Sequence, residues 1–188
     1  MHLKTELSKE LIETFIAGEI ESLRVIYDET KNYMYRIIYR MVNNKSDTED
    51  LLHDVYEKIY KNRKSYNSKK AGIKTWISKV AINHTLNHLK KKKTQGLYKH
   101  MTHMGNNQNE LLDDVVLDEK GIKIQQVLQK VNPAFRICLV LKYIEDYSYE
   151  ETSKILNIKI GTVRSRLSRG KKEFEKIYKQ ERSEDNEC

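Results

Sequence analysis

A basic stretch near the end of the chain carries the residue types that read nucleic-acid bases. Between Gly161 and Lys172, arginine, lysine and hydroxyl side chains recur at helical intervals of three and four residues. Arginine can pair with O6 and N7 of guanine, and short hydroxyls reach phosphates or base edges. A threonine at the start of such a helix stands where backbone N–H groups favour a phosphate. The candidate side chains for reading duplex DNA are Thr162, Arg164, Ser165, Ser168, Arg169 and Lys172.

The elements that would position these side chains form a predicted helix-turn-helix. A helix predicted over 161–178 has an apolar stripe opposite the arginines, and we expect this stripe to pack on Ile155, Leu156 and Ile158 of a preceding short helix. Asn157 lies in the turn, where asparagine tolerates a left-handed backbone. A plain solvated basic helix is the alternative, but arginines opposite an apolar stripe favour a major-groove reader. The stripe consists of Val163, Leu167, Gly170, Phe174 and Ile177.

A second basic helix, predicted over about 73–93, has a different chemistry. It combines an aromatic ring, amides and a lysine run, which suits a single strand because bases stack on aromatics and lysines neutralise phosphate. The loop before it could hold an unstacked base. The alternative is that Trp76 is core and that the lysines are a solvated helix end favoured by the helix dipole. The candidate residues are Tyr66, Asn67, Lys69, Trp76, Lys79, Asn83, Asn87, Lys90 and Lys91.

The helix predicted over about 46–63 is acidic on one face and apolar on the other. Ser46 is the expected N-cap, with Glu49 completing a capping box. The apolar side is predicted to be buried and contains Leu51, Leu52, Val55, Tyr56, Ile59 and Tyr60. The acidic side contains Asp47, Glu49, Asp50, Asp54 and Glu57.

Composition restricts the fold and the compartment. The 188 residues carry 35 Lys+Arg against 27 Asp+Glu, a net charge of +8 that favours a polyanionic partner. With 7 Gly and one Pro, the chain has few turn signals, so an all-α fold is expected. Two cysteines far apart support neither a disulfide framework nor a cysteine zinc site. No apolar run is long enough to cross a membrane or to act as a signal peptide, so we expect a cytoplasmic protein with no membrane insertion.

The periodicity predicts two small helical domains, loosely joined. The first, residues 1–94, has three to four helices, beginning with a long periodic stretch over 19–44. A linker follows over 95–118, rich in Gly and Asn and later acidic. The second domain, 119–180, has four helices, one of them capped by Asn132-Pro133 and buried on nearly all sides. A polar tail without regular structure is expected over 181–188.

Other chemistry finds little support. His84 and His88 have a metal-compatible spacing, but their nearest companions, His100 and His103, lie in the predicted linker, and a histidine zinc site needs three or four rigid ligands. The sequence has no Gly-rich phosphate loop and no Ser/His/Asp set. We therefore expect no metal site, no cofactor and no enzymatic activity.

Taken together, these motifs resemble the extracytoplasmic-function (group 4) sigma factors of bacterial RNA polymerase. The resemblance covers about residues 20–93 and 119–179. Its first half rests on the runs from Asp47 to Tyr56 and from Thr75 to Lys91, and its second half on those from Val131 to Arg136 and from Tyr149 to Leu167. The chain departs from the family pattern at His53, Asn87, Thr152-Ser153 and Asn157. Two motif sets in this order are far more specific than a helix-turn-helix alone.

The resemblance implies a division of labour between the surfaces. The acidic helix would dock on the β′ clamp helices of the polymerase core through Asp47, Asp50, Leu51, Leu52, Asp54 and Val55. The loop 66–72 with Asn83 and Asn87 would capture a flipped base of the promoter −10 element. The face with Arg164 and Arg169 would read the −35 element, and the second domain would sit near the β flap. The family commonly has an anti-sigma partner.

Two other functions remain open at this point. One is a helix-turn-helix regulator that acts without the polymerase core, and the other is a basic protein bound to RNA or to an anionic membrane. The acidic face of the helix over 46–63 discriminates between them and a sigma factor, because only a sigma factor needs it for docking.

Overall fold

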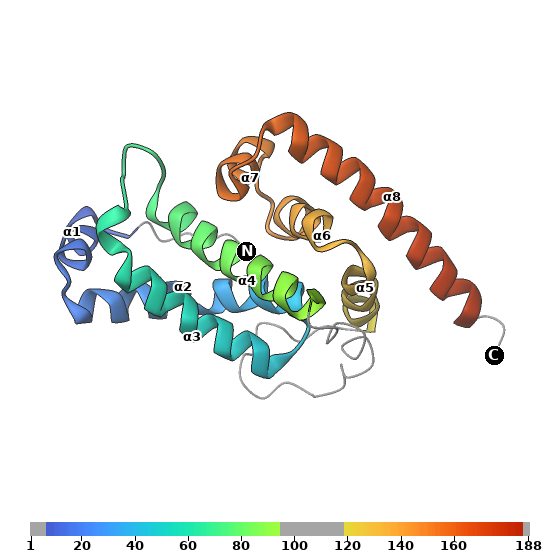
Figure 1. The fold of residues 1–188 in the computed structure, drawn as a ribbon, viewed down its shortest axis with the longest axis horizontal. Coiled ribbons are helices and arrows are strands. Elements are labelled where there is room, and N and C mark those ends of the chain that lie inside the picture. Colours follow the sequence, from blue (N-terminus) through green and yellow to red (C-terminus); the bar gives the residue numbers. More distant parts are fainter. Residues whose placement is uncertain (1–6, 95–118, 186–188) are drawn as a thin grey trace.

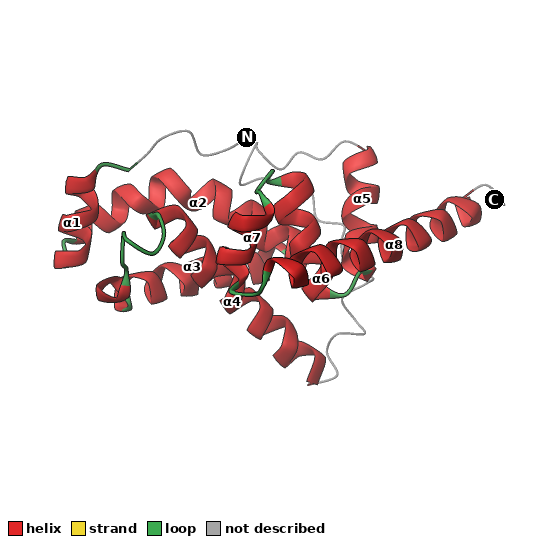
Figure 2. Cartoon of the chain, turned by 90° about the horizontal axis from the view of Figure 1, so that it is seen from above, coloured by secondary structure: helices red, strands yellow, loops and turns green. Residues whose placement is uncertain are grey.

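The computed structural model describes residues 7–94 and 119–185, and within these ranges the regular elements are all helical (Figures 1 and 2). The expected all-α fold is confirmed. The first domain contains α1 (Lys9–Ala17), α2 (Ile20–Val42), α3 (Lys45–Lys61), the short 3-10 turn η1 (Arg63–Ser65) and α4 (Ile73–Thr94). The second contains α5 (Glu119–Lys130), α6 (Pro133–Leu139), the π-helical turn η4 (Val140–Ile144), α7 (Tyr149–Leu156) and α8 (Ile160–Asp185).

Helix α1 adds to the elements predicted from the sequence, whose periodic pattern begins only at residue 19. It begins where Ser8 accepts a hydrogen bond from the Leu11 N–H at 3.1 Å. It ends at Gly18, whose φ of 106° is the left-handed conformation that glycine adopts without strain. Phe15 of α1 is fully buried, so this helix closes one end of the first core.

The start of α3 differs from the prediction of a Ser46 cap. Asn43 takes a left-handed conformation (φ 52°) that ends α2, and the chain enters α3 at once. Asn44 is therefore the N-cap, and its side chain accepts a hydrogen bond from the Asp47 N–H at 2.9 Å. The predicted capping box with Glu49 does not form, since Ser46 already lies inside the helix.

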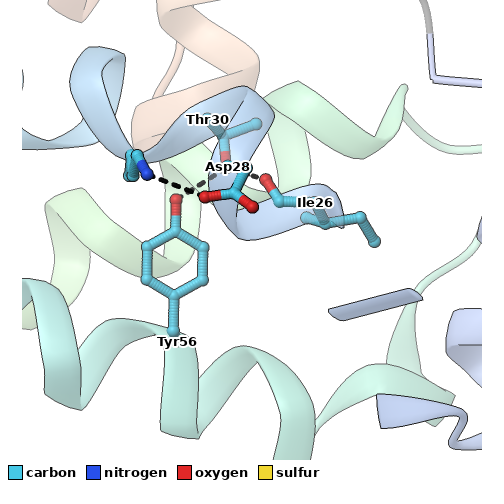
Figure 3. A network of polar contacts seen from close by, with 5 residues as sticks. Ile26, Asp28, Thr30 and Tyr56 are labelled. Atoms are coloured by element: carbon cyan, nitrogen blue, oxygen red, sulfur yellow. Dashed lines mark hydrogen bonds and ion pairs between the residues drawn. The ribbon is translucent and has the colours of Figure 1, made fainter. Parts of the chain in front are cut away.

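A buried polar pair joins α2 to α3 (Figure 3). The Thr30 hydroxyl donates its proton to the Ile26 carbonyl at 2.6 Å, so the Tyr56 hydroxyl, also at 2.6 Å, is the donor to Thr30. Both side chains are buried, and burial raises the pKa of the Tyr56 phenol. Because a buried hydroxyl without a partner is costly, this pair favours one register of α2 against α3.

The centre of the second domain is apolar, as predicted, but it is not one regular helix. Asn132 caps α6 by accepting from the Ala134 N–H at 2.9 Å, and Pro133 is its first residue, as expected. After Leu139 the chain widens into η4, and the Glu145 N–H bonds the Val140 carbonyl at 2.9 Å. The buried apolar residues are Ile137, Cys138, Leu139, Val140 and Leu141.

Helix α8 packs on α6 as well as on α7, so its apolar stripe has a second partner besides the predicted preceding helix. A Cβ built on Gly170 would lie 3.0 Å from Cβ of Phe135, which shows how closely the two helices approach. The helix also runs through Asp185, whereas the sequence predicts a loss of regular structure after residue 180. A salt bridge of 2.6 Å between Lys130 and Glu181 joins this extension to α5.

The described helices of the two domains contact each other. Helix α7 lies against α4, and α5 lies against α2. Figure 1 shows α6 and α7 of the second domain beside the first. The predicted linker, 95–118, lies outside the residues that the structure describes, so the domain boundary there stays a prediction.

Candidate nucleic-acid interface

The helix-turn-helix is built by local capping. Ser148 and Glu151 form a capping box, in which the Ser148 side chain accepts from the Glu151 N–H at 3.1 Å and the Glu151 carboxylate accepts from the Ser148 N–H at 2.8 Å. Asn157 ends α7 with φ 53°, which confirms the left-handed turn expected from its residue type. Helix α8 then begins at Ile160, so only three residues separate the two helices.

The six predicted major-groove residues share one side of α8. Val163 and Leu167 are buried on the opposite side, with exposed fractions of 0% and 4%. Thr162 is half-buried at the first turn. The remaining five are exposed and are Arg164, Ser165, Ser168, Arg169 and Lys172. The structure therefore presents a basic face free of its own core, while the role of each side chain stays a prediction.

Tyr149 is an additional member of this surface that sequence reasoning missed. The Arg164 guanidinium carbon lies 5.9 Å from the centre of the Tyr149 ring, and Lys142 Nζ lies 5.5 Å from it. Both distances fall within the range of cation–π contacts. Periodicity gave no signal for this pair, since Tyr149 belongs to α7 and Arg164 to α8.

The Ser165 hydroxyl is already hydrogen-bonded within α8. Its hydroxyl donates to the Thr162 carbonyl at 3.0 Å, within the same helix. In this rotamer the oxygen still has acceptor capacity but no proton to give. Ser165 can thus accept from an amino group of cytosine or adenine, whereas donation to a phosphate requires the hydroxyl to turn.

The second predicted surface, on α4, is exposed along one edge. Asn83, Asn87, Lys90 and Lys91 are exposed, and Lys79 is half-buried. Trp76 is also half-buried and packs against the core, so part of the alternative interpretation of this residue holds. Trp76, Lys79, Asn83, Asn87 and Lys90 follow one another at steps of three or four residues, so they share one side of α4.

The loop before α4 brings an aromatic pair together. The rings of Tyr66 and Trp76 meet edge to face, with centres 5.7 Å apart. Burial of Tyr66 raises the pKa of its phenol. Asn67 Oδ1 accepts from the Lys69 N–H at 2.9 Å, which shapes the turn and leaves both side chains in solvent.

The acidic face of α3 is only partly available. Asp47 pairs with Lys92 of α4 at 2.5 Å and is 20% exposed, and Asp54 accepts from His84 at 3.0 Å. Asp50 is exposed. The three apolar residues named for docking, Leu51, Leu52 and Val55, are 2%, 8% and 0% exposed.

The side chains of Leu51 and Val55 fill the core of the domain and do not lie on its surface, so their part in docking stays a prediction. A shallow cavity of about 400 Å³ between α2 and α3 offers apolar surface instead, and Leu52 contributes to it. Its lining residues are Leu23, Tyr27, Glu49, Leu52, His53, Tyr56, Glu57 and Tyr60. The position of Leu23 and Tyr27 on α2 explains why reasoning on the α3 helix alone missed this groove.

The histidines of α4 face α3. His84 contacts Asp54 through Nε2 and Lys58 through Nδ1. Burial and then the Lys92 charge lower the pKa of His88. Within 7–94 and 119–185, no group of three His, Cys, Asp or Glu side chains could hold a metal ion, and His100 and His103 lie outside these ranges.

Two further sequence expectations concern cysteines and membranes. Cys138 is a free, buried thiol whose pKa is raised by burial to about 11, while Cys188 falls outside the described ranges. Over the residues that the structure covers, none of the helices has the length and apolar character needed to span a bilayer.

Comparison with known proteins agrees with both halves of the chain. The family model "Sigma-70 region 2" matches residues 26–95, and "Sigma-70, region 4" matches residues 122–174. The ECF RNA polymerase sigma factor SigW of Bacillus subtilis is 29% identical over 186 residues, covering 89% of this chain and 95% of that protein. SigX of the same organism is 25% identical, covering 83% of each chain.

Solved structures show the same fold. CnrH, in complex with the cytosolic domain of CnrY, has a TM-score of 0.67 at 12% identity, covering 91% of this chain and 96% of that one. The sigma factor RpoE of Bartonella quintana, in complex with the anti-sigma factor NepR, has a TM-score of 0.65 at 17% identity, covering 83% and 96%. Because both sigma-70 regions occur in order on the folds that carry the two basic faces, the chain belongs to the extracytoplasmic-function group of the sigma-70 family of RNA polymerase sigma factors.

Proposed function

We propose that this chain binds the bacterial RNA polymerase core and directs promoter-specific initiation of transcription. The observation that carries the proposal is the basic face of α8, where Arg164, Ser165 and Arg169 are exposed opposite a buried apolar stripe. In this role the chain is a regulatory subunit that selects the start site, and the polymerase core supplies the catalysis. Because its partner acts on chromosomal DNA, we place the protein in the cytoplasm.

The −35 element is read by α8 in the major groove. Arg164 and Arg169 supply base contacts, since a guanidinium can bond O6 and N7 of guanine together. Thr162 and Lys172 hold phosphates on either side of the base contacts. The Tyr149 ring, whose centre lies 5.9 Å from the guanidinium carbon of Arg164, favours orientations of Arg164 that keep this cation–π contact.

The −10 element is opened and held by α4 and the loop 66–72. Tyr66 and Trp76 provide the aromatic surface for an unstacked base, and Asn83 and Asn87 bond base edges. Lys69, Lys79, Lys90 and Lys91 follow the phosphates of the displaced strand.

The polymerase core docks on α3 and the groove beside it. Asp50 and Asp54, both exposed, supply charge, while Leu23 and Tyr27 supply apolar area in the groove. The buried residues Leu51 and Val55 act indirectly by holding α3 in place. We assign the β′ clamp helices to this surface and the β flap to the second domain.

An anti-sigma factor is a further partner under this proposal. Two proteins with the same fold, CnrH and the Bartonella RpoE, are known in complexes with CnrY and the anti-sigma factor NepR, respectively. This supports the existence of a regulatory partner for the present chain without identifying it.

Transcription in vitro with core enzyme tests the proposal. On a pool of random promoters, the wild-type chain is expected to yield transcripts that share −35 and −10 elements. Asp50→Arg with Asp54→Arg is expected to abolish core binding in a pull-down, because two repulsive charges replace two attractive ones at the docking face.

The matched control is Glu13→Arg with Glu29→Arg, which changes the net charge equally on α1 and α2, away from the docking face. It should bind core like the wild type. Core binding that survives the Asp50/Asp54 double reversal would contradict the docking assignment. Sequence-specific binding to DNA with no response to core would instead point to a regulator independent of the polymerase.

A further inference from the structure

The basic face of α8 continues past the residues that are proposed to read the −35 element. From Arg164 the exposed side of the helix runs through Ser168 and Lys172 and then through three more cations, at steps of three or four residues. Residues at such steps share one side of a helix. The three cations are all exposed and lie beyond residue 174, where the match to sigma-70 region 4 ends. They form a surface that we call the distal ridge, made of Lys176, Lys179 and Arg182.

The helix that carries the distal ridge is held by α5 on its other side. Glu181 forms its salt bridge of 2.6 Å with Lys130, and the Tyr178 ring has its centre 5.9 Å from Lys123 Nζ. Tyr178 also stacks on Phe174, with ring centres 6.0 Å apart. Figure 2 shows the last turns of α8 reaching beyond the rest of the second domain. The ridge is therefore fixed to its domain on one side and open on the other.

Charge is sorted between these two sides of α8. Glu173 accepts a hydrogen bond from the Asn132 N–H at 3.2 Å, and Glu181 is paired with α5, so both carboxylates are directed to the domain. Glu175, which is exposed, pairs with Lys171 at 3.9 Å. Among the carboxylates that the structure describes, none forms a salt bridge with a cation of the distal ridge. A row of uncompensated positive charge on a fixed helix favours a polyanionic partner.

Helix geometry places the distal ridge outside the major groove when the reading face is inside it. At about 1.5 Å per residue, Arg164 and Lys172 are about 12 Å apart along the helix, which is close to the groove's width of about 12 Å. Lys176 is about 18 Å from Arg164 on the same scale, and Arg182 about 27 Å. Beyond the edge of the groove the duplex presents its sugar-phosphate backbone, so the ridge faces phosphates and no base edges.

We propose that the distal ridge binds phosphates of the duplex DNA that flanks the −35 element. Lys176, Lys179 and Arg182 add affinity there without reading sequence, because phosphate contacts position a protein and carry no base information. The proposal rests on the proposed function, which places α8 in the −35 element. Duplex DNA fits the ridge better than an acidic protein segment does, since the ridge continues the same side of α8 that faces the DNA.

The experiment measures the affinity of core enzyme carrying the full chain for a promoter fragment with duplex on both sides of the −35 element, at several salt concentrations. The variant is Lys176→Gln with Lys179→Gln and Arg182→Gln. The slope of log affinity against log salt concentration is expected to fall in magnitude by about 3, or about 1 for each cation removed. Between about 50 and about 200 mM salt, the wild type should then lose about 40-fold more affinity than the variant.

Two controls separate this effect from total charge and from folding. Lys9→Gln with Arg24→Gln and Lys64→Gln removes the same charge from exposed positions of the first domain and should keep the wild-type slope. Lys176→Arg with Lys179→Arg keeps the charge on the ridge and should also keep that slope. Circular dichroism checks that every variant retains its helix content.

Phosphate ethylation interference locates the contacts. The wild type is expected to require a group of phosphates beside the −35 element that the ridge variant no longer requires, while the pattern within the element is unchanged. Equal slopes for the ridge variant and the first-domain control, or an unchanged interference pattern, overturn the inference. A reduced slope of the ridge variant for duplex DNA without core, combined with no transcription by the wild type on core, would remove the proposed function and leave the ridge as a DNA-binding surface.

Discussion

At the scale of the residue, the basic side chains of α8 differ in their surroundings, and this decides what each can do. Arg164 rests over the Tyr149 ring, whereas Arg169 and Lys172 extend into solvent further along the helix. A supported guanidinium loses less freedom on binding, so it is better suited to select a base. Lys172 is a flexible point charge and suits a phosphate.

Arg164→Ala is expected to weaken promoter binding by the holoenzyme by about 1–3 kcal/mol and to relax base preference at one position of the −35 element. Lys172→Ala should weaken binding to all sequences alike. It should also reduce the slope of log affinity against log salt concentration by about 1. Binding to a randomised −35 library at several salt concentrations separates the two. An equal loss over all sequences for Arg164→Ala would mark it as a phosphate contact.

His88 gives the folded domain a dependence on pH. Its pKa is lowered from 6.5 in the folded state, so the unfolded chain binds a proton first as pH falls. At higher pH His88 is neutral in both states and has no effect on the free energy of unfolding. As pH drops through about 6.5, protonation of His88 in the unfolded chain lowers the free energy of unfolding. In urea denaturation, the free energy of unfolding is expected to fall less between pH 7.5 and pH 5.5 for His88→Gln than for the wild type. The exposed His53→Gln serves as the control, and an unchanged loss in His88→Gln would contradict this account.

At the scale of the element, helix ends in this protein depend on a few residues in left-handed conformations. Gly18 and Asn43 end α1 and α2, and Asn157 ends α7. The sequence predicts a left-handed asparagine only at the last of these. Glycine is favoured at position 18 for two reasons: its φ is left-handed, and a Cβ there would lie 2.8 Å from Arg63 Nη2.

Gly18→Ala should therefore lower the free energy of unfolding by about 1–3 kcal/mol, the usual cost of a strained left-handed residue. Gly161→Ala is the matched control, since Gly161 lies in the first turn of α8 and a Cβ there would meet nothing within 4 Å. That control should be neutral or should stabilise by up to about 1 kcal/mol. Chemical denaturation measures both, and equal effects would show that the φ of Gly18 carries no cost.

At the scale of the whole molecule, charge is divided between surfaces rather than spread evenly. The net charge of +8 coexists with the partly acidic face of α3, where Lys92 and His84 already pair with two of the carboxylates. Under the proposed function, the exposed remainder is directed to a protein partner, and the basic faces of α4 and α8 are directed to DNA. The interface between the domains adds a second level of organisation.

Gln125 of α5 is buried, and its Nε2 lies 3.4 Å from the Tyr39 carbonyl at the end of α2. Glutamate at this position would repel the helix carbonyls, whereas lysine would keep a donor. If the interface couples the domains, the free chain should unfold in a single transition by calorimetry. Gln125→Glu should split it into two, because each domain then unfolds alone, while Gln125→Lys should keep one. Two transitions in the wild type would show that the packed arrangement contributes no measurable coupling.

Much of the local structure was predictable from residue types alone. The long helices over 20–42 and 73–94, the Asn132-Pro133 cap and the turn at Asn157 follow from interactions within a few residues. So does the exposure of Arg164 opposite Val163, because helical periodicity sets both. The resemblance to sigma factors used the same local runs, and the family matches confirm it.

Tertiary structure alone decided which surfaces remain free. Whether Leu51 faces a partner or the core, and which carbonyls Arg136 satisfies, depends on residues far away in the chain: Arg136 and Met41 are 95 positions apart. No periodic pattern records such a pair, since the energy of a buried arginine depends on every acceptor that folding brings to it. Local sequence thus determined the helices and their polar faces, and only packing settled how the two halves meet.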